Sequence, residues 1–171
     1  DVRDAVTAFE REAGLTLHEN QISAVKASIE NGVQVVTGGP GTGKTTIVKC
    51  ILHLFKNLGQ RVQLCAPTGR AAKRLSEATG VEAKTIHRLL DLDYKDGRGF
   101  FTYNDQTKLP VDVVIVDEMS MVDEYVFNAL VKAINNGARL VLVGDKDQLA
   151  SVGAGNVLGA EQHGHMDKVG Y

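Results

Sequence analysis

The residues best suited to chemistry in this sequence form a glycine-rich loop that ends in a lysine and a threonine. Residues 38–45 read Gly-Gly-Pro-Gly-Thr-Gly-Lys-Thr and match the pattern G-x-x-x-x-G-K-[ST] at every position. In this pattern backbone N–H groups cradle phosphate oxygens, Lys44 reaches the β- and γ-phosphates, and the Thr45 hydroxyl binds Mg²⁺. The alternative is a glycine-rich turn with a surface lysine. The predicted nucleotide-binding residues are Gly39, Pro40, Gly41, Thr42, Gly43, Lys44, Thr45 and Thr46.

Two adjacent carboxylates follow an apolar run later in the chain. Residues 113–116 are Val-Val-Ile-Val, and Asp117 and Glu118 come directly after them. A nucleotide-bound Mg²⁺ is held by an acidic residue at such a strand end, and Asp117 is the candidate. Glu118 lies one residue further out, where it is placed to orient and deprotonate an attacking water. The alternative is that the pair forms a helix cap or a solvated turn.

Two glutamines bear on the same site. Gln148 follows the apolar run 140–143 and is a candidate to touch the γ-phosphate and so report whether ATP or ADP is bound. The segment that carries it also reads as an ordinary Asp-Lys-Asp turn. Gln21 lies near the start of a predicted helix, where its amide is a candidate contact for the edge of adenine. The sequence therefore predicts a site for ATP and Mg²⁺, with Lys44, Glu118 and Gln148 as catalytic residues.

A basic helix start forms a second candidate surface. Thr68 and the backbone at Gly69 follow the apolar run 62–66, where they can bond a phosphate at a helix N-terminus. Arg70 and Lys73, with Arg74 beside them, place positive charge where the helix dipole favours acids, so a bound anion would offset the cost. The alternative is a solvated basic helix face. The next short element adds donors at Thr85, His87 and Arg88.

The elements that position these residues alternate along the chain. Apolar runs rich in β-branched residues read as buried strands, and periodic stretches between them read as helices. This alternation indicates an α/β fold with a parallel sheet covered by helices on both faces, and ligands beyond the carboxyl ends of the strands. Strands are expected at 33–37, 62–66, 113–116 and 140–143, and helices at 1–13, 45–58, 70–78, 85–90 and 124–134.

Three segments complete the predicted organisation. We expect an N-terminal helical segment over residues 1–32, a P-loop ATPase lobe over 33–159, and a disordered or unrelated tail over 160–171. Thr16 and Glu19 are expected to form the capping box that starts the second helix, which ends at Gly32. Residues 91–110 are expected to be irregular, with a hairpin near 100–103.

Composition describes an ordinary globular protein of 171 residues, with 43% hydrophobic and 23% charged residues. A net charge of −2 excludes a global field that attracts nucleic acid, so any such binding needs a local cluster. Cys50 and Cys65 do not make a disulfide framework and are expected to be buried thiols. His163 and His165 lack further metal ligands. With no signal peptide or bilayer-spanning stretch, we expect a cytoplasmic protein with no membrane contact.

Taken together, these motifs resemble the first, RecA-like motor lobe of a superfamily-1 DNA helicase with 5′-to-3′ polarity, of the RecD-like (exodeoxyribonuclease V alpha-subunit) type. The resemblance spans about residues 15–159, and its last stretch discriminates best because many glycine-loop ATPases lack it. The matching stretches are TLHENQ at 16–21, GGPGTGKTT at 38–46, APTGRAAKRL at 66–75, TIHRLL at 85–90, VDEMSMVD at 116–123 and VGDKDQLASVGAG at 143–155.

The resemblance implies a role for each motif. It implies that Gln21 contacts adenine, that Asp117 and Glu118 serve metal and water, and that Gln148 couples the γ-phosphate to a strand-binding groove. The implied partners are single-stranded DNA, a second motor lobe of the same parent chain, and nuclease-complex subunits. The residues implied to face single-stranded DNA are Pro67, Thr68, Gly69, Arg70, Thr85 and His87.

One feature of the family is missing from the sequence. The family's motor needs a second lobe with an arginine that reaches the γ-phosphate, and too few residues follow Gly144 for a domain, whose usual minimum is about 50 residues. We therefore expect a piece of a longer enzyme that translocates on single-stranded DNA and unwinds duplex. The piece alone is expected to hydrolyse ATP slowly. The alternative functions are a nucleotide-gated binding module and a non-helicase P-loop ATPase.

Overall fold

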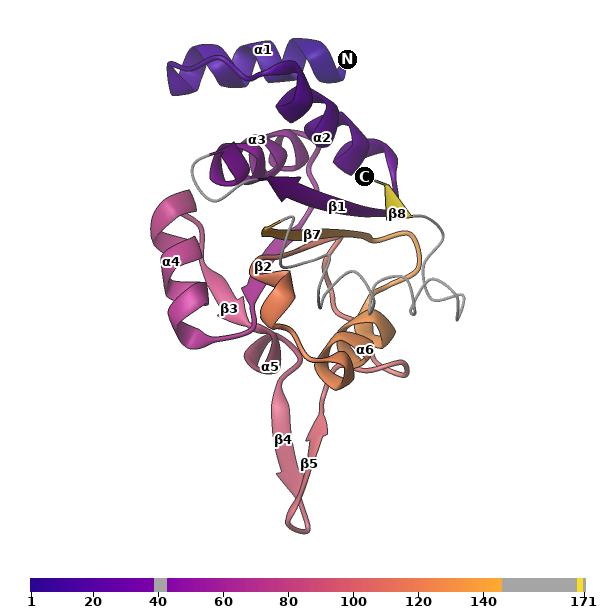
Figure 1. Cartoon of the computed structure of the whole chain (residues 1–171). Coiled ribbons are helices and arrows are strands. Elements are labelled where there is room, and N and C mark those ends of the chain that lie inside the picture. Colours follow the sequence, from indigo (N-terminus) through magenta and orange to yellow (C-terminus); the bar gives the residue numbers. More distant parts are fainter. Residues whose placement is uncertain (39–42, 146–168, 171) are drawn as a thin grey trace.

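The protein is built around one parallel β-sheet. The computed structural model describes residues 1–38, 43–145 and 169–170. In these residues six strands pair in the order β3-β2-β6-β7-β1-β8, and every pairing is parallel (Figure 1). The strands are β1 Val33–Gly38, β2 Val62–Ala66, β3 Ala83–Thr85, β6 Val113–Val116, β7 Arg139–Asp145 and β8 Val169–Gly170.

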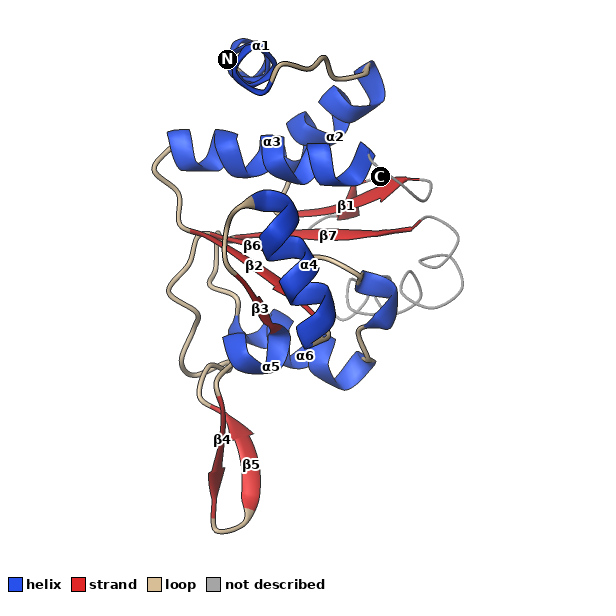
Figure 2. Cartoon of the chain, turned by 90° about the vertical axis from the view of Figure 1, so that its left-hand side faces the viewer, coloured by secondary structure: helices blue, strands red, loops and turns tan. Residues whose placement is uncertain are grey.

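Helices cover both faces of the sheet, as Figure 2 shows. Helices α1, α2 and α3 pack with α4 over one face, while α5 and α6 lie on the other. Successive strand side chains serve opposite faces, so Val113 and Ile115 join the α3 cluster whereas Val114 and Val116 join the α6 cluster. The predicted fold class is therefore confirmed. The helices are α1 Val2–Ala13, α2 Glu19–Glu30, α3 Gly43–Asn57, α4 Gly69–Thr79, α5 Ile86–Leu89 and α6 Glu124–Ala133.

The N-terminal helices belong to the same core as the sheet. Val6 and Phe9 of α1 are buried in the cluster that holds α3 and one face of the central strands. The segment predicted as 1–32 thus packs directly on the lobe that follows it. The segment boundaries themselves remain predictions. Within 160–171 the structure describes only Val169 and Gly170, which pair with Val33 and Gln34.

The start of α2 differs from the prediction. The helix begins at Glu19, with His18 as the cap, and the backbone N–H of His18 donates to Gln21 Oε1 over 2.8 Å. The Thr16–Glu19 capping box is wrong because Leu17 is buried and its N–H donates to Glu10 Oε2 of α1 at 2.7 Å. That contact keeps the chain extended until His18. The helix also ends earlier than Gly32, with Asn31 in an extended conformation as its cap.

The middle of the chain holds two features that the sequence misplaced. The edge strand β3 was missed, because Ala-Lys-Thr has no apolar run. An antiparallel hairpin of β4 Leu92–Lys95 and β5 Arg98–Phe101 lies earlier than the expected 100–103 and projects from the body (Figure 1). Its turn residues Asp96 and Gly97 have φ of 53° and 76°, as the tightest hairpin turns require. Seven of its eight strand residues are exposed, and Phe101 packs against the core.

Both cysteine thiols are buried, as expected. Cys50 lies in α3 and Cys65 in β2, and neither forms a disulfide. Burial and the nearby Glu10 carboxylate raise the pKa of Cys50 to about 12, and burial also raises the pKa of Cys65. Across the described residues, none of the helices has the length and apolar character needed to cross a bilayer.

Candidate functional site

The predicted phosphate and metal residues meet at the carboxyl edge of the central strands. Lys44 and Thr45 lie in the first turn of α3, which follows β1, while Asp117 and Glu118 follow β6. Strands β1, β7 and β6 are consecutive in the sheet, so these segments end side by side. They enclose a pocket of about 190 Å³. The pocket is lined by Lys44, Thr45, Val48, Leu75, Asp117, Glu118 and Val143.

Lys44 has a partner that the sequence did not identify. Its Nζ forms an ion pair with Asp145 Oδ1 at the end of β7, and the two side chains are only 18% and 30% exposed. The available signal was that Asp145 stands two residues after the apolar run 140–143, much as Asp117 comes directly after the run 113–116. A phosphate bound in this pocket would compete with Asp145 for this ammonium group.

The environment of Asp117 favours a cation beside it. Burial raises the pKa of Asp117, and the neighbouring Glu118 charge adds to the rise, while the Glu118 backbone N–H, Lys44 and Arg74 oppose it. An ionised carboxylate here is therefore incompletely compensated. Among the described residues no group of three or more His, Cys, Asp or Glu side chains could hold a metal by itself. Asp117 and the Thr45 hydroxyl fit Mg²⁺, which commonly takes one or two carboxylates and completes its shell with phosphates and water.

Glu118 occupies an unusual backbone conformation at the mouth of the pocket. Its φ and ψ of 55° and 43° are left-handed, which is uncommon for a residue other than glycine. It caps the 3₁₀ helix η1, Met119–Met121, and its carbonyl accepts the Met121 N–H at 3.0 Å. Its Oε1 lies 3.6 Å from Arg74 Nη2 of α4. Neither η1 nor this ion pair was predicted from the sequence.

Gln21 links the start of α2 to the start of α3. Its Oε1 accepts the His18 N–H, and its Nε2 donates to the Gly43 carbonyl over 3.3 Å. A Cβ at Gly43 would lie 3.4 Å from the same Nε2, so the two segments are in close contact. Gln21 thus lies next to the phosphate-loop helix, a neighbour that the sequence did not identify. Its contact with adenine remains a prediction.

The predicted nucleic-acid residues lie at the carboxyl ends of the neighbouring strands β2 and β3. Two of the hydroxyls cap helices: Thr68 Oγ1 accepts the Ala71 N–H, and Thr85 Oγ1 accepts the Arg88 N–H, each at 3.1 Å. Pro67 is half-buried, and the His87 ring lies 5.9 Å from the ring of Phe101. We call the exposed residues Thr68, Gly69, Arg70, Lys73 and His87 the basic edge.

Comparison with known proteins identifies the family. A family model described as an AAA domain matches residues 21–154, which include both pocket-forming segments. The chain belongs to the AAA domain family. The pocket agrees with this assignment, because it brings the lysine that follows β1 together with the two carboxylates that follow β6.

Curated relatives confirm the resemblance to RecD helicases. The AAA domain is 45% identical over 148 residues to the ATP-dependent RecD2 DNA helicase of Deinococcus radiodurans, covering 86% of this chain and 20% of that protein. It is 43% identical over 163 residues to the RecBCD enzyme subunit RecD of Mycolicibacterium smegmatis, covering 82% and 29%. The chain therefore spans less than a third of the length of these relatives.

Solved structures agree with the fold. Bacteroides sp. Pif1, crystallised in complex with ADP-AlF4, superimposes with a TM-score of 0.53 at 25% identity, over 77% of this chain and 32% of that one. The large terminase ATPase domain of Thermus phage P74-26 gives a TM-score of 0.51 at 18% identity, over 81% and 69%, and supports the fold alone.

Several predicted site residues lie outside the described part of the AAA domain. They are Gly39, Pro40, Gly41, Thr42 and Gln148. Thr46, by contrast, lies in the first turn of α3 beside Thr45. The structure thus positions the lysine, the first threonine and the two carboxylates of the predicted ATP site.

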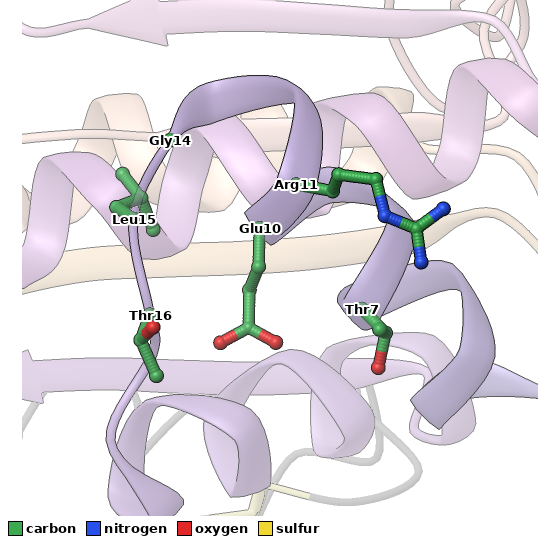
Figure 3. A pocket seen from close by; sticks show the side chains of 6 residues that line it. All are labelled: Thr7, Glu10, Arg11, Gly14, Leu15 and Thr16. Carbon is green, nitrogen blue, oxygen red and sulfur yellow. The ribbon is translucent and has the colours of Figure 1, made fainter.

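A second hollow of about 390 Å³ lies at the junction of α1 and α2 (Figure 3). The Glu10 side chain points between the chain at Thr16 and the helix at Thr7. Glu10 Oε2 already accepts the Leu17 N–H, so the Glu10 side chain joins α1 to the segment before α2. We assign this hollow a structural role.

The raised pKa of Asp117 predicts a change in stability. We expect Asp117→Asn to raise the Tm measured without nucleotide or Mg²⁺ at neutral pH. Because the folded chain binds this proton more tightly than the unfolded chain, the ionised carboxylate lowers stability above the usual aspartate range. The gain over wild type should shrink as the pH falls through that range.

Asp112→Asn is the control variant, and its expected change in Tm has the opposite sign. Hydrogen bonds from the Arg61 side chain and backbone hold the pKa of Asp112 below its usual value. Its ionised form therefore stabilises the folded chain at neutral pH, and Asp112→Asn should lower the Tm. A lower Tm for Asp117→Asn as well would show that the Asp117 carboxylate is already compensated in the fold.

Proposed function

We propose that this AAA domain binds Mg-ATP and hydrolyses it as the first motor lobe of a DNA helicase. The observation that carries the proposal is the pocket at the ends of β1 and β6, where Lys44 and Thr45 face Asp117 and Glu118. An ammonium, a hydroxyl and a carboxylate in a partly buried carboxyl-edge pocket are the groups that phosphoryl transfer requires. The likeness to relatives named as RecD and RecD2 helicases supports the same reading.

Each pocket residue has a distinct part in the proposed reaction. Lys44 holds the β- and γ-phosphates, and the backbone of residues 39–43 and the Thr46 hydroxyl hold the remaining phosphate oxygens. Thr45 and Asp117 would hold Mg²⁺, which would supply positive charge to offset that of the phosphates. Glu118 orients a water for in-line attack on the γ-phosphorus and accepts its proton, while the bond from the γ-phosphorus to the oxygen that bridges it to the β-phosphorus breaks and ADP leaves.

The two glutamines complete the proposed nucleotide site. Gln21 contacts the adenine edge, since its amide already lies beside the first residue of α3. Gln148 touches the γ-phosphate and transmits its presence to the groove that binds the strand. Lys44, Glu118 and Gln148 are thus the proposed catalytic residues.

For the second substrate we propose the phosphate backbone of single-stranded DNA. The basic edge presents Arg70, Lys73 and His87 beside the N-termini of α4 and α5, with Pro67 and Thr85 at the ends of the preceding strands. Single-strand binding of this kind depends on backbone charge and base stacking rather than on sequence. The parent enzyme would supply a second motor lobe, and nuclease-complex subunits are proposed partners. We place the protein in the cytoplasm, since its relatives are named as DNA helicases and RecBCD subunits.

The DNA part of the proposal is tested by salt-dependent binding. We expect the double variant Arg70→Ala, Lys73→Ala to bind oligothymidylate about two- to thirtyfold more weakly, as the loss of two exposed ion pairs of roughly 0.2–1 kcal/mol each implies. The slope of log affinity against log salt should fall by about 1.4, or 0.7 for each lost phosphate contact. Fluorescence anisotropy over a salt series measures both.

Lys49→Ala, Lys56→Ala is the matched control. It removes two exposed cations from α3 and should leave the affinity and the salt slope unchanged. A wild-type chain that binds Mg-ATP but does not bind oligothymidylate would instead be a nucleotide-gated binding module. Equal losses in both double variants would mean that the basic edge has no special role.

A further inference from the structure

One cation lies between the basic edge and the nucleotide pocket. Arg74 is in the second turn of α4, next to Lys73 and four residues after Arg70, so it shares their end of the helix. Its guanidinium is turned toward the pocket, where Nη2 lies 3.6 Å from Glu118 Oε1. The same charge also acts on Asp117. Arg74 is therefore placed to interact with either surface.

The backbone fixes this arrangement. Strands β2 and β6 pair in register, with Cys65 opposite Val116, and the Asp117 N–H donates to the Cys65 carbonyl over 2.9 Å. Two residues, Pro67 and Thr68, separate β2 from helix α4, and Asp117 alone separates β6 from Glu118. The start of α4 and the Glu118 backbone are thus held beside each other by ladder hydrogen bonds. Only the two side chains are left to change partners.

We propose that Arg74 is a positioning residue that holds the Glu118 carboxylate away from the reacting water until the phosphate backbone of single-stranded DNA takes over its guanidinium. The proposal rests on the proposed function and adds a mechanism by which DNA controls hydrolysis. A guanidinium binds a phosphodiester as readily as a carboxylate, because both present anionic oxygens to its N–H groups. DNA on the basic edge would therefore compete directly with Glu118.

The exposure of the pair suits a reversible contact. The Arg74 and Glu118 side chains are 64% and 34% exposed, and exposed ion pairs contribute little to stability. A weak pair restrains a carboxylate without locking it. The Glu118 backbone meanwhile stays in place, because its carbonyl accepts the Met121 N–H of η1. Release of Arg74 would then turn the side chain alone.

A double-mutant cycle on DNA binding tests the competition without nucleotide, metal or a second lobe. Glu118→Gln leaves Arg74 without its anionic partner, so we expect the affinity for a fluorescein-labelled oligothymidylate to rise about two- to fivefold. Arg74→Gln should lower the affinity. In the Arg74→Gln background, Glu118→Gln should have no further effect. Fluorescence anisotropy at low salt gives all four affinities.

The pair Arg3–Glu19 is a matched control, with 3.4 Å between its charged atoms and an arginine 65% exposed. Glu19→Gln removes the same charge from the chain and should leave the affinity unchanged. An equal rise from Glu118→Gln with and without Arg74 would overturn the inference, since it would reflect net charge alone. A wild-type chain that does not bind oligothymidylate would refute the proposed DNA function itself, which is a different result.

Turnover supplies a second readout. Arg74→Gln should raise the DNA-free kcat about two- to fivefold and leave KM for ATP unchanged, because the restraint acts on Glu118 and not on the nucleotide. Arg74→Lys keeps the positive charge and should therefore have the wild-type kcat. Arg3→Gln should also leave kcat unchanged. A lower kcat in Arg74→Gln would show that Arg74 holds Glu118 in its productive position, and would overturn the restraint.

Discussion

Lys44→Ala is expected to lower ATP turnover about 10²- to 10³-fold. Its side chain lines the pocket together with Asp117, and in the proposed reaction it is the cation that holds the β- and γ-phosphates. Removal of one preorganised charge from such a site has an effect of this size on kcat. Steady-state release of phosphate measures it, and binding of a fluorescent ATP analogue should weaken as well, because the ground-state phosphates lose the same contact.

Lys49→Ala is the control for this variant, since Lys49 lies in the same helix but is exposed to solvent. It should retain wild-type turnover and nucleotide affinity. A Lys44→Ala chain that binds the analogue with wild-type affinity and hydrolyses ATP at the wild-type rate would leave only a sheet scaffold, and the proposed function would have to be abandoned.

Glu118→Gln is expected to separate binding from chemistry. The change preserves the size of the side chain but removes its ability to accept a proton from water. Loss of a positioned general base lowers kcat about 10²- to 10⁴-fold. Affinity for the ATP analogue should remain close to that of the wild type, because Lys44, Thr45 and Asp117 are intact. Single-turnover hydrolysis and equilibrium binding, measured on the same preparation, test the two halves of this expectation.

Glu82→Gln, an exposed residue between α4 and β3, controls for the loss of one negative charge and should leave turnover unchanged. If Glu118→Gln hydrolysed ATP as fast as Glu82→Gln, another group would have to activate the water. Weakened nucleotide binding in Glu118→Gln would instead place this carboxylate among the groups that hold the metal or the phosphates.

The sequence predicted the central strands and the convergence of the main site residues. Val113–Val116 and the run before Asp145 are continuously apolar because both of their faces are buried, so local pattern suffices to find them. Parallel strands place their carboxyl ends at one edge of the sheet, so the positions of Lys44 and Asp117 after two such strands are enough to predict that they meet. The predicted roles of these residues still await the experiments above.

Contacts between segments far apart along the chain could not be predicted from the sequence. Lys44 and Asp145 are 101 residues apart along the chain, and no local pattern pairs them. The contact of Arg74 with Glu118 depends likewise on how α4 packs against the end of β6. The error at Thr16 has the same origin, because Glu10, seven residues before Leu17, decides where α2 begins.

The hairpin of β4 and β5 has a consequence for how this protein family can diversify. Its strand residues other than Phe101 are exposed, and an isolated pair of strands gains little stability in water. Changes in the length of the hairpin, or in its residues other than Phe101, therefore have almost no effect on the stability of the rest of the molecule. Such an appendage can be lengthened, shortened or exchanged between descendants while the ATP-binding edge is inherited intact.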